Sequence, residues 1–349
     1  MLELTLFFGC FLVTYFGVRA FRAWTLRRGV LDHPNERSSH TDPTPRGGGL
    51  VVAVVVLAAY VIAAGLVGFE ISWGFLAGSL IVVAISWLDD IYSVSFIWRL
   101  LAHSVAAICL LLDLGYLSTI VMYDTTTPLS IGIIGAVVSF VWIIWLINAY
   151  NFMDGIDGIA GTQAVAAAIG WLLAGLANGS PATMVLGGSV LFAALAFLLH
   201  NWSPARIFMG DAGSAFLGFT FASLPFIFRG SLTSDSGISA TIGVLFVWMF
   251  VFDSVVTLIR RILNGEKIWT AHRQHLYQRL VISGYSHQKT TLIYGTFSLP
   301  IAILAGLSAG EDTRVPIYVP IIAAVGCSIV LLVICQSRKC LFGGTEQNA

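Results

Sequence analysis

The sequence predicts an all-α integral membrane protein, a polytopic bundle of about 11 transmembrane helices. Of its 349 residues, 57% are hydrophobic and 10% are charged, and the mean hydropathy is +0.88. Soluble domains carry far more charge. Apolar runs of roughly 17–22 residues recur along the chain, as bilayer-crossing helices require, whereas a β-barrel would show short alternating segments.

The apolar runs define the expected spans in order. The first run lacks a basic leader and a small-residue cleavage site, so we expect a retained span and not a signal peptide. No second folded domain is recognisable, so residues 1–349 are expected to form a single multi-spanning domain. The spans are expected at about residues 2–18, 50–67, 73–88, 100–117, 131–147, 159–177, 182–199, 213–228, 237–259, 291–308 and 316–335.

The basic residues indicate how the chain crosses the membrane. When loops are assigned alternately to the two sides, sixteen of the 18 Lys and Arg residues fall on one side, and only Arg229 and Arg314 fall on the other. An excess of positive charge marks the cytoplasmic side. We therefore expect the N-terminus outside and the C-terminus in the cytoplasm. The same assignment places five polar loops on the cytoplasmic face, where they would form one site.

The loop between the first two spans contains two polar segments, residues 32–40 and 43–49. The second segment ends in three consecutive glycines, Gly47 to Gly49. These glycines either allow tight packing at the start of the second span or, beside Arg46, expose backbone N–H groups to a phosphate at the bilayer surface. The sequence leaves both interpretations open.

Asp89 and Asp90 end the third span. A solvated helix terminus would explain two acids there. However, a carboxylate at a helix C-terminus opposes the helix dipole, which favours a cation at that end. The pair therefore requires a compensating charge, and we interpret it as part of a functional site.

Residues 148–158 form the densest polar stretch, between two apolar runs. Each of its polar groups would cost roughly 2.5–3.5 kcal/mol in hydrocarbon, so the stretch must lie where a span meets water. Asn148 and Asn151 share a helix face, as do Asp154 and Asp157 if the helix continues. An Asn/Asp/Gly turn is the alternative. A turn needs fewer such residues, so we favour a site.

Phe208 to Ser214 opens the eighth span with an aromatic residue, an acid and two glycines. A helix N-terminus offers unpaired N–H groups and positive partial charge, which suit phosphate oxygens. Asp211 could hold the metal ion that accompanies a phosphate. An ordinary Asp cap would explain Asp211 but not the glycines beside it.

The loop after the ninth span contains His272, Arg273 and His275. Basic residues beside a membrane are usually charge anchors. Two His residues flanking an Arg fit an anion clamp for a diphosphate better than a zinc site, because no third strong ligand has suitable spacing. Asp253, inside the ninth span, is either a functional acid or the partner of a polar helix end.

These motifs resemble those of the polyprenyl-phosphate N-acetylhexosamine-1-phosphate transferases, which start cell-envelope glycans on a lipid carrier. The resemblance runs from Asp32 to about Arg279, and the residues around 34–49 look most like the O-antigen-initiating branch. The four motifs that carry it are Asp89-Asp90, Asn148-x-x-Asn151-x-x-Asp154-Gly-x-Asp157-Gly, Phe208-x-Gly-Asp211-x-Gly-Ser and the His272/His275 loop.

The resemblance implies a Mg²⁺-dependent enzyme of the bacterial inner membrane, with its active site facing the cytoplasm. It would transfer an N-acetylhexosamine-1-phosphate from a UDP-N-acetylhexosamine to undecaprenyl phosphate and release UMP. The family pattern places Mg²⁺ on Asn151 and Asp211 and stacks uracil on Phe208. The other implied residues are Asp89, Asp90, Asp154 and Asp157 for catalysis, and Asn148, Gly155, His272, Arg273, His275 and Arg46 for substrate binding.

One departure from the peptidoglycan branch concerns a lysine that follows the Asp pair there by three or four positions. This sequence has none, and the role would fall to Arg99 or Arg46. The alternative function is a membrane cation transporter that uses the acids near the helix ends. Transporter sites usually lie at the midplane on broken helices or repeats, whereas these acids lie at one surface. We expect no nucleic-acid partner, and the sequence does not identify the sugar.

Overall fold

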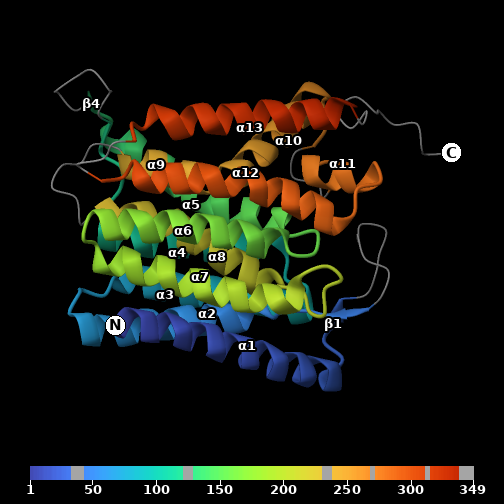
Figure 1. The fold of residues 1–349 in the computed structure, drawn as a ribbon, viewed down its shortest axis with the longest axis horizontal. Coiled ribbons are helices and arrows are strands. Elements are labelled where there is room, and N and C mark those ends of the chain that lie inside the picture. Colours follow the sequence, from blue (N-terminus) through green and yellow to red (C-terminus); the bar gives the residue numbers. More distant parts are fainter. Residues whose placement is uncertain (33–42, 121–128, 230–237, 268–271, 311–314, 338–349) are drawn as a thin grey trace.

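The computed structural model describes residues 1–32, 43–120, 129–229, 238–267, 272–310 and 315–337 (Figure 1). Within these residues, 10 helices are long and apolar enough to cross a membrane. The count is 11 when the bent pair α9 (Ile238–Phe246) and α10 (Trp248–Leu263) is taken as one span. The predicted all-α polytopic fold is therefore confirmed.

The long helices lie side by side, and short elements join them at the two ends of the bundle (Figure 1). In two small antiparallel pairs, β1 (Leu31–Asp32) pairs with β2 (Thr44–Pro45), and β3 (Thr119–Ile120) pairs with β4 (Leu129–Ser130). The remaining helices are α1 (Leu2–Arg28), α2 (Gly49–Val67), α3 (Trp73–Tyr92), α4 (Phe96–Leu114), α5 (Gly132–Met153), α6 (Ile159–Ala177), α7 (Pro181–Asn201), α8 (Asp211–Arg229), α11 (Leu276–Ile282), α12 (His287–Leu307) and α13 (Tyr318–Ser337).

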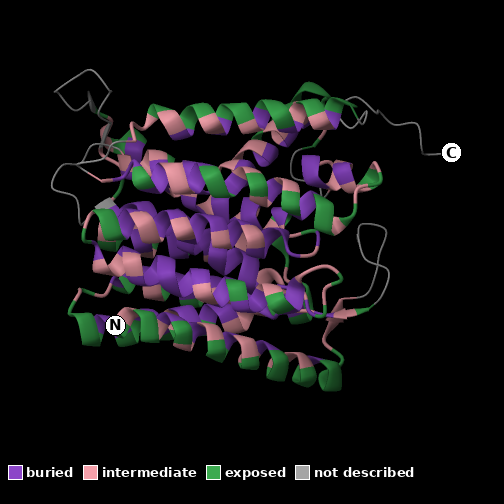
Figure 2. Ribbon diagram, viewed as in Figure 1, coloured by how far each residue is buried: buried purple, intermediate pink, exposed green. Residues whose placement is uncertain are grey.

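Helix α8 is the centre of the bundle. In its membrane-crossing segment 94% of the residues are buried, the largest share among the described spans. Helices α2, α3 and α5 pack around it, and the purple of buried residues concentrates in the middle of the bundle in Figure 2. A helix that is apolar all round must be enclosed by protein or lipid. Because α8 begins at Asp211, this packing fixes the position of that acid.

The ninth span is broken, although the sequence predicts one continuous run over residues 237–259. Helices α9 and α10 meet at Val247 with a bend of 80°. The bend frees the carbonyl of Phe246, which accepts a hydrogen bond from Gln163 Nε2 on α6 at 2.8 Å. A bilayer offers no water to such a group, so a protein donor must satisfy it.

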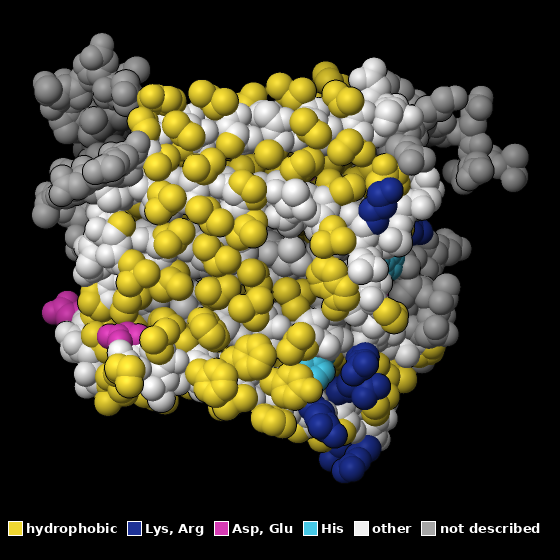
Figure 3. Space-filling view, viewed as in Figure 1, with side chains coloured by type: hydrophobic (Ala, Val, Ile, Leu, Met, Phe, Trp, Pro, Cys, Tyr) yellow, Lys and Arg dark blue, Asp and Glu magenta, His cyan; other side chains and the backbone are white. Residues whose placement is uncertain are grey.

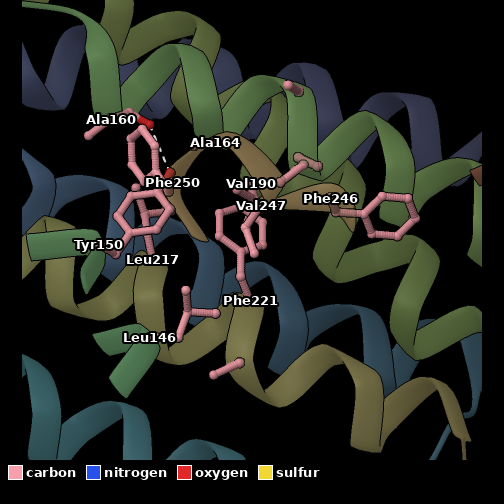
Figure 4. Close-up of a cluster of buried hydrophobic side chains, with 14 of the residues drawn as sticks. Leu146, Tyr150, Ala160, Ala164, Val190, Leu217, Phe221, Phe246, Val247 and Phe250 are labelled. Carbon is pink, nitrogen blue, oxygen red and sulfur yellow. Dashed lines mark hydrogen bonds between the residues drawn. The ribbon is translucent and has the colours of Figure 1, made fainter. Parts of the chain in front are cut away.

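Apolar packing holds the break in place (Figure 4). Phe250 lies edge to face against Tyr150, with ring centroids 5.0 Å apart. The Tyr150 hydroxyl donates to the carbonyl of Ala160 at 2.8 Å, the dashed line in Figure 4. The start of α10 is thereby fixed against α5 and α6, beside the polar end of α5.

The glycines at the start of α2 serve packing. A Cβ atom on Gly49 would lie 2.4 Å from the Cα atom of Gly213 in α8, so the two helices approach backbone to backbone. The N–H groups of Gly48 and Gly49 donate to the carbonyls of Phe208 and Met209 at 3.0 and 2.8 Å. Of the two interpretations that the sequence left open, these contacts support packing, because the two N–H groups are already used.

Basic side chains gather at one end of the face seen in Figure 3, acidic side chains lie at the other end, and a hydrophobic belt separates them. The basic end is the one at which β1 and α11 lie in Figure 1. The last turn of α1 carries Arg27 and Arg28, and the last turn of α10 carries Arg260 and the buried Arg261. The sequence predicts that this basic end faces the cytoplasm.

We predict that this orientation can be measured by cysteine labelling. In a background in which the native cysteines are replaced by Ser, Ser95→Cys in the α3–α4 turn should react with an impermeant maleimide only from the cytoplasm. Glu70→Cys, in the α2–α3 turn, should react only from outside. Both positions are exposed, and α3 separates them. Labelling of both after permeabilisation is the control, and the reverse pattern would contradict the predicted orientation.

Candidate active site

A cavity of about 720 Å³ lies between α4, α5, α10 and α11. One part of its wall is polar, and the other part is apolar. The polar residues are Arg99, Asn148, Asn151, Asp154, Gly155, His272, His275, Tyr277 and Gln278. The apolar residues are Phe96, Leu100, Val141, Ile144, Trp145, Phe152 and Leu258. The cavity thus brings together residues from two of the four motifs, the Asn148–Gly158 stretch and the histidine loop, with a hydrophobic surface.

The apolar wall opens toward the hydrocarbon. Phe96, Val141 and Phe152 line the cavity, and each is more than half exposed. Phe96 begins α4, Phe152 lies in the last turn of α5, and Val141 lies in the middle of α5. A membrane-embedded molecule can therefore reach the polar wall from within the bilayer.

Helix α5 places two amides of the central motif. Asn148 Nδ2 donates to the carbonyl of Ile144 at 2.7 Å, and Asn151 Oδ1 accepts from the hydroxyl of Ser214 on α8 at 3.3 Å. The second contact brings Asn151 beside the first turn of α8, in which Asp211 lies. The two predicted metal ligands are therefore neighbours, from two different helices.

The helix does not continue to Asp157, so the shared helix face considered for Asp154 and Asp157 does not form. Helix α5 ends at Met153, Asp154 is its C-terminal cap residue, and both acids lie in the turn that leads into α6. Gly158 has φ +77°, a left-handed conformation that a side chain rarely adopts, and it starts α6. The stretch is at once a turn and part of the cavity wall.

Asp157 connects three parts of the chain. Its Oδ2 accepts from the N–H of Ala205 at 3.2 Å and lies 3.4 Å from His287 Nδ1. Its carbonyl accepts from the hydroxyl of Thr291 at 2.8 Å. Burial opposes ionisation of this carboxyl, but the hydrogen bond and charge of His287 outweigh it and lower its pKa. Asp157 holds the turn against α12 and does not line the cavity.

Asp154 has the opposite electrostatic environment. It lines the cavity, and burial together with the charges of Asp211, Asp90 and Asp157 raises its pKa well above the usual range. Carboxylates at such proximity cannot all ionise without a cation or a retained proton. The cluster therefore favours either a bound cation or a protonated Asp154 at neutral pH.

Arg99 bridges two of the acids. Its Nη1 lies 3.5 Å from Asp211 Oδ2 and also donates to Asp89 Oδ2. Asp89 Oδ1 accepts from the N–H of Val94 at 2.6 Å, which closes the α3–α4 turn. Of the two candidates for the role of the absent lysine, Arg99 lines the cavity and Arg46 does not. Asp89 itself does not line the cavity.

Asp90 caps a neighbouring helix. Its two oxygens accept from the N–H groups of Asp211 and Ala212, each at 3.1 Å, and its side chain is 1% exposed. The Arg46 guanidinium donates to the Asp90 carbonyl, and its Nε lies 3.9 Å from Asp90 Oδ1. The expectation that these N–H groups of α8 meet a phosphate is therefore wrong. Asp90 fixes the first turn of α8, from which Asp211 projects.

The histidine loop is held against α10. Asp253 accepts hydrogen bonds from the N–H groups of Leu276 and Tyr277 at 2.8 and 3.1 Å. The sequence left two interpretations of Asp253 open, and these contacts show that it is the partner of a polar helix end. The rings of His272 and His275 lie 5.0 Å apart, and both line the cavity. Burial, followed by the charges of His275 and Arg261, lowers the pKa of His272 to about 4.

Some of the predicted site residues lie away from the cavity wall, and one residue that lines it was not predicted. Phe208 and Arg273 are half-buried but do not line the cavity. Tyr277 was missed. It lines the cavity and donates its hydroxyl to the carbonyl of Phe152 at 2.9 Å, which joins α11 to the end of α5. The only hint in the sequence is that this aromatic residue stands two positions after His275.

Comparison with known proteins decides the family. A model described as glycosyl transferase family 4 matches residues 72–229. The chain is also 30% identical over 285 residues to a probable undecaprenyl-phosphate N-acetylglucosaminyl 1-phosphate transferase of Bacillus subtilis, an alignment that covers 77% of this chain and 74% of the relative. The chain belongs to glycosyl transferase family 4.

Other relatives place it in one branch of glycosyl transferase family 4, the polyprenyl-phosphate N-acetylhexosamine-1-phosphate transferases. A decaprenyl-phosphate N-acetylglucosaminephosphotransferase of Mycobacterium tuberculosis is 28% identical, with 81% of this chain and 76% of the relative covered. An undecaprenyl-phosphate alpha-N-acetylglucosaminyl 1-phosphate transferase of Thermotoga maritima is 24% identical, with 94% and 96% covered. The region matched by the family model contains α3 to α8, and therefore Arg99, Asn151, Asp154 and Asp211.

Proposed function

We propose that this protein transfers an N-acetylhexosamine-1-phosphate from a UDP-N-acetylhexosamine to undecaprenyl phosphate, with release of UMP, on the cytoplasmic face of a bacterial inner membrane. The observation that carries the proposal is the divided cavity, which presents an exposed apolar wall beside a polar wall with Asp154, amides, histidines and Arg99. A lipid phosphate and a water-soluble nucleotide sugar can meet only at such a boundary. The names of the relatives support the same reaction.

The reaction needs positioning more than covalent chemistry. An oxygen of the lipid phosphate attacks the β-phosphorus, a new P–O bond forms, and the bond from that phosphorus to the oxygen shared with the α-phosphate breaks. UMP leaves with the bonding electrons. The second pKa of a phosphate monoester is near 6, so the attacking group is largely a dianion at neutral pH. The protein must then align the two phosphates and neutralise their charge, which is how phosphoryl transfer is mainly catalysed.

The residues present fit a magnesium ion. Asn151 and Asp211 offer hard oxygen ligands from adjacent helix ends, and the charges around Asp154 favour a cation. In the described part of the chain, no group of three or more His, Cys, Asp or Glu residues is arranged to hold a metal by itself. Mg²⁺ commonly binds one or two protein groups and completes its shell with water and substrate phosphates. When bound, it would neutralise charge on the diphosphate.

The remaining polar residues take roles that follow from their positions. Arg99 lies between Asp89 and Asp211 and can neutralise a phosphate that enters along the apolar wall. His272 and His275 line the same cavity and can donate to the diphosphate. Asp154 lines the same cavity, and its raised pKa lets it hold a proton when no cation neutralises the acids around it.

The break between α9 and α10 does not favour the transporter alternative. Broken helices in transporters expose backbone groups to a central ion site. Here the freed carbonyl of Phe246 is taken by Gln163, whose own Oε1 accepts from Ser298 at 2.7 Å. Neither Phe246 nor Gln163 lines the cavity. The break redirects α10 and offers no carbonyl to an ion.

We predict that the purified protein with undecaprenyl phosphate, Mg²⁺ and a panel of UDP-N-acetylhexosamines releases UMP and forms a lipid diphosphate sugar, as mass spectrometry would show. UDP-N-acetylglucosamine heads the panel because the relatives are named for that sugar. The 6-deoxy sugars follow, because residues 34–49 resemble the O-antigen-initiating branch. The sugar with the highest kcat/KM identifies the glycan that the enzyme starts.

The same assay distinguishes one-step from two-step transfer. With direct attack, labelled UMP incubated with the UDP-sugar and lipid-free enzyme should show no exchange into the nucleotide-sugar pool. Exchange at the rate of turnover would instead require a covalent phosphosugar on the enzyme. If no UDP-sugar yields a lipid product, the proposed function is wrong.

A further inference from the structure

Asp253 is the most heavily hydrogen-bonded acid in the described structure, although it lies inside a membrane span and is fully buried. Three helices supply its donors. Besides the N–H groups of Leu276 and Tyr277, its oxygens accept from the hydroxyl of Tyr294 at 2.5 Å and from that of Thr257 at 3.2 Å. The fifth contact is with His275, which lines the cavity: its Nδ1 lies 3.1 Å from Asp253 Oδ1.

These contacts determine which ring nitrogen of His275 carries a proton. A buried carboxylate that accepts four hydrogen bonds is held in its ionised form and has no proton to donate. The short contact to His275 is therefore attractive only if Nδ1 bears the hydrogen and donates to Oδ1. The nitrogen that Asp253 does not contact, Nε2, is on a ring that lines the cavity and lies at a tilt against the ring of His272.

We propose that Asp253 is a positioning residue for the transfer reaction and that it acts through His275. It fixes the orientation and the tautomer of the ring, so that Nε2 is the nitrogen available to the diphosphate of the nucleotide sugar. It also stabilises the ring when Nε2 is protonated, and the ring can then donate a charged hydrogen bond to a phosphate oxygen. This inference rests on the proposed function for its substrate, but the contact between Asp253 and the ring of His275 does not depend on that function.

The same carboxylate makes the arrangement rigid. Because it also holds the first N–H groups of α11, the ring and the helix that carries it share one anchor in α10. The Gln278 side chain accepts from the N–H of His275 at 3.3 Å, which fixes the backbone at that residue. A ring held in this way loses little conformational freedom when a substrate binds.

A double-mutant cycle tests the role. Asp253→Asn should lower kcat by about 10–100-fold, the range seen for groups that orient a binding histidine, and should change the KM for the nucleotide sugar less. In a His275→Asn background the same change should have little further effect, because the residue through which Asp253 acts is gone. Thr257→Val, which removes a different donor from the same oxygen, is the matched control and should keep nearly full turnover.

An equal loss from Asp253→Asn in both backgrounds would overturn the proposal, since the acid would then act independently of His275. A second measurement needs no substitution at Asp253 and no activity. In ¹⁵N-histidine-labelled protein, the His275 signals, identified by their absence in His275→Asn, should show a protonated Nδ1. A neutral ring protonated only at Nε2 would overturn the proposal. Failure of the proposed function would appear separately, as a wild-type protein without turnover.

Discussion

Asp211→Asn is expected to reduce turnover by roughly 10²–10³-fold, the scale of losing one preorganised charged group, while the protein remains folded. The substitution preserves size and removes one anionic oxygen from the proposed magnesium shell. The Asp211 side chain is 35% exposed and forms an ion pair with Arg99, so little packing depends on its charge. Its N–H group would still donate to Asp90. Turnover measured against Mg²⁺ concentration should also show a weaker apparent affinity for the ion.

Asn151→Ala should act in the same direction, because it removes the second oxygen ligand. Ser214→Ala is the control for this pair. It deletes the hydroxyl that bridges the two helices, 3.3 Å from Asn151 Oδ1, but removes neither proposed ligand. It should therefore retain most turnover. Normal magnesium-dependent turnover in Asp211→Asn would show that the ion is not bound there.

Asp90→Leu is expected to cost about 3–5 kcal/mol of stability and nearly all activity, because it breaks a buried charged contact by removing one partner. Two N–H groups at the start of α8 would lose their acceptor, and the Arg46 guanidinium would lose the opposite charge beside it. The first turn of α8 would then loosen, and Asp211 with it. The unfolding temperature in detergent measures the first effect, and turnover per folded molecule measures the second.

Asp113→Leu provides the comparison at the other end of α3. Asp113 on α4 accepts from the Ser72 hydroxyl at 2.6 Å and from the N–H of Gly74 at 2.9 Å, so it also caps a neighbouring helix, but far from the cavity. Its loss should lower the unfolding temperature without changing the turnover of the folded fraction. If Asp90→Leu behaves in the same way, Asp90 has no part in placing Asp211.

The spans and the gathering of the polar motifs could be predicted from the sequence, because hydropathy and loop charge are local properties. The break at Val247 could not. Neither Pro nor Gly stands at Phe246, Val247 or Trp248, the residues at the bend. What stabilises the bend is the side chain of Gln163 on another helix, together with the packing of Phe250.

The roles of the buried acids also depend on distant contacts. The sequence marks Asp90 and Asp253 as unusual, because each is an acid in or at the end of an apolar run. It does not show which helix end each of them meets. Asp90 meets α8, and Asp253 meets α11. Gly49 was equally ambiguous, and only the approach of Gly213 shows that its missing side chain serves packing.

The exposed apolar wall of the cavity affects how the rate depends on the concentrations of the two substrates. For the proposed reaction, a lipid that enters past Phe96, Val141 and Phe152 arrives by lateral diffusion in the plane of the bilayer. Its occupancy of the site then follows its mole fraction among the membrane lipids, whereas that of the nucleotide sugar follows its molarity in water. Adding inert lipid should slow the enzyme, and diluting the vesicles at fixed nucleotide-sugar concentration should not. The rate therefore depends on the density of the lipid substrate per membrane area and on the concentration of the nucleotide sugar per volume of water.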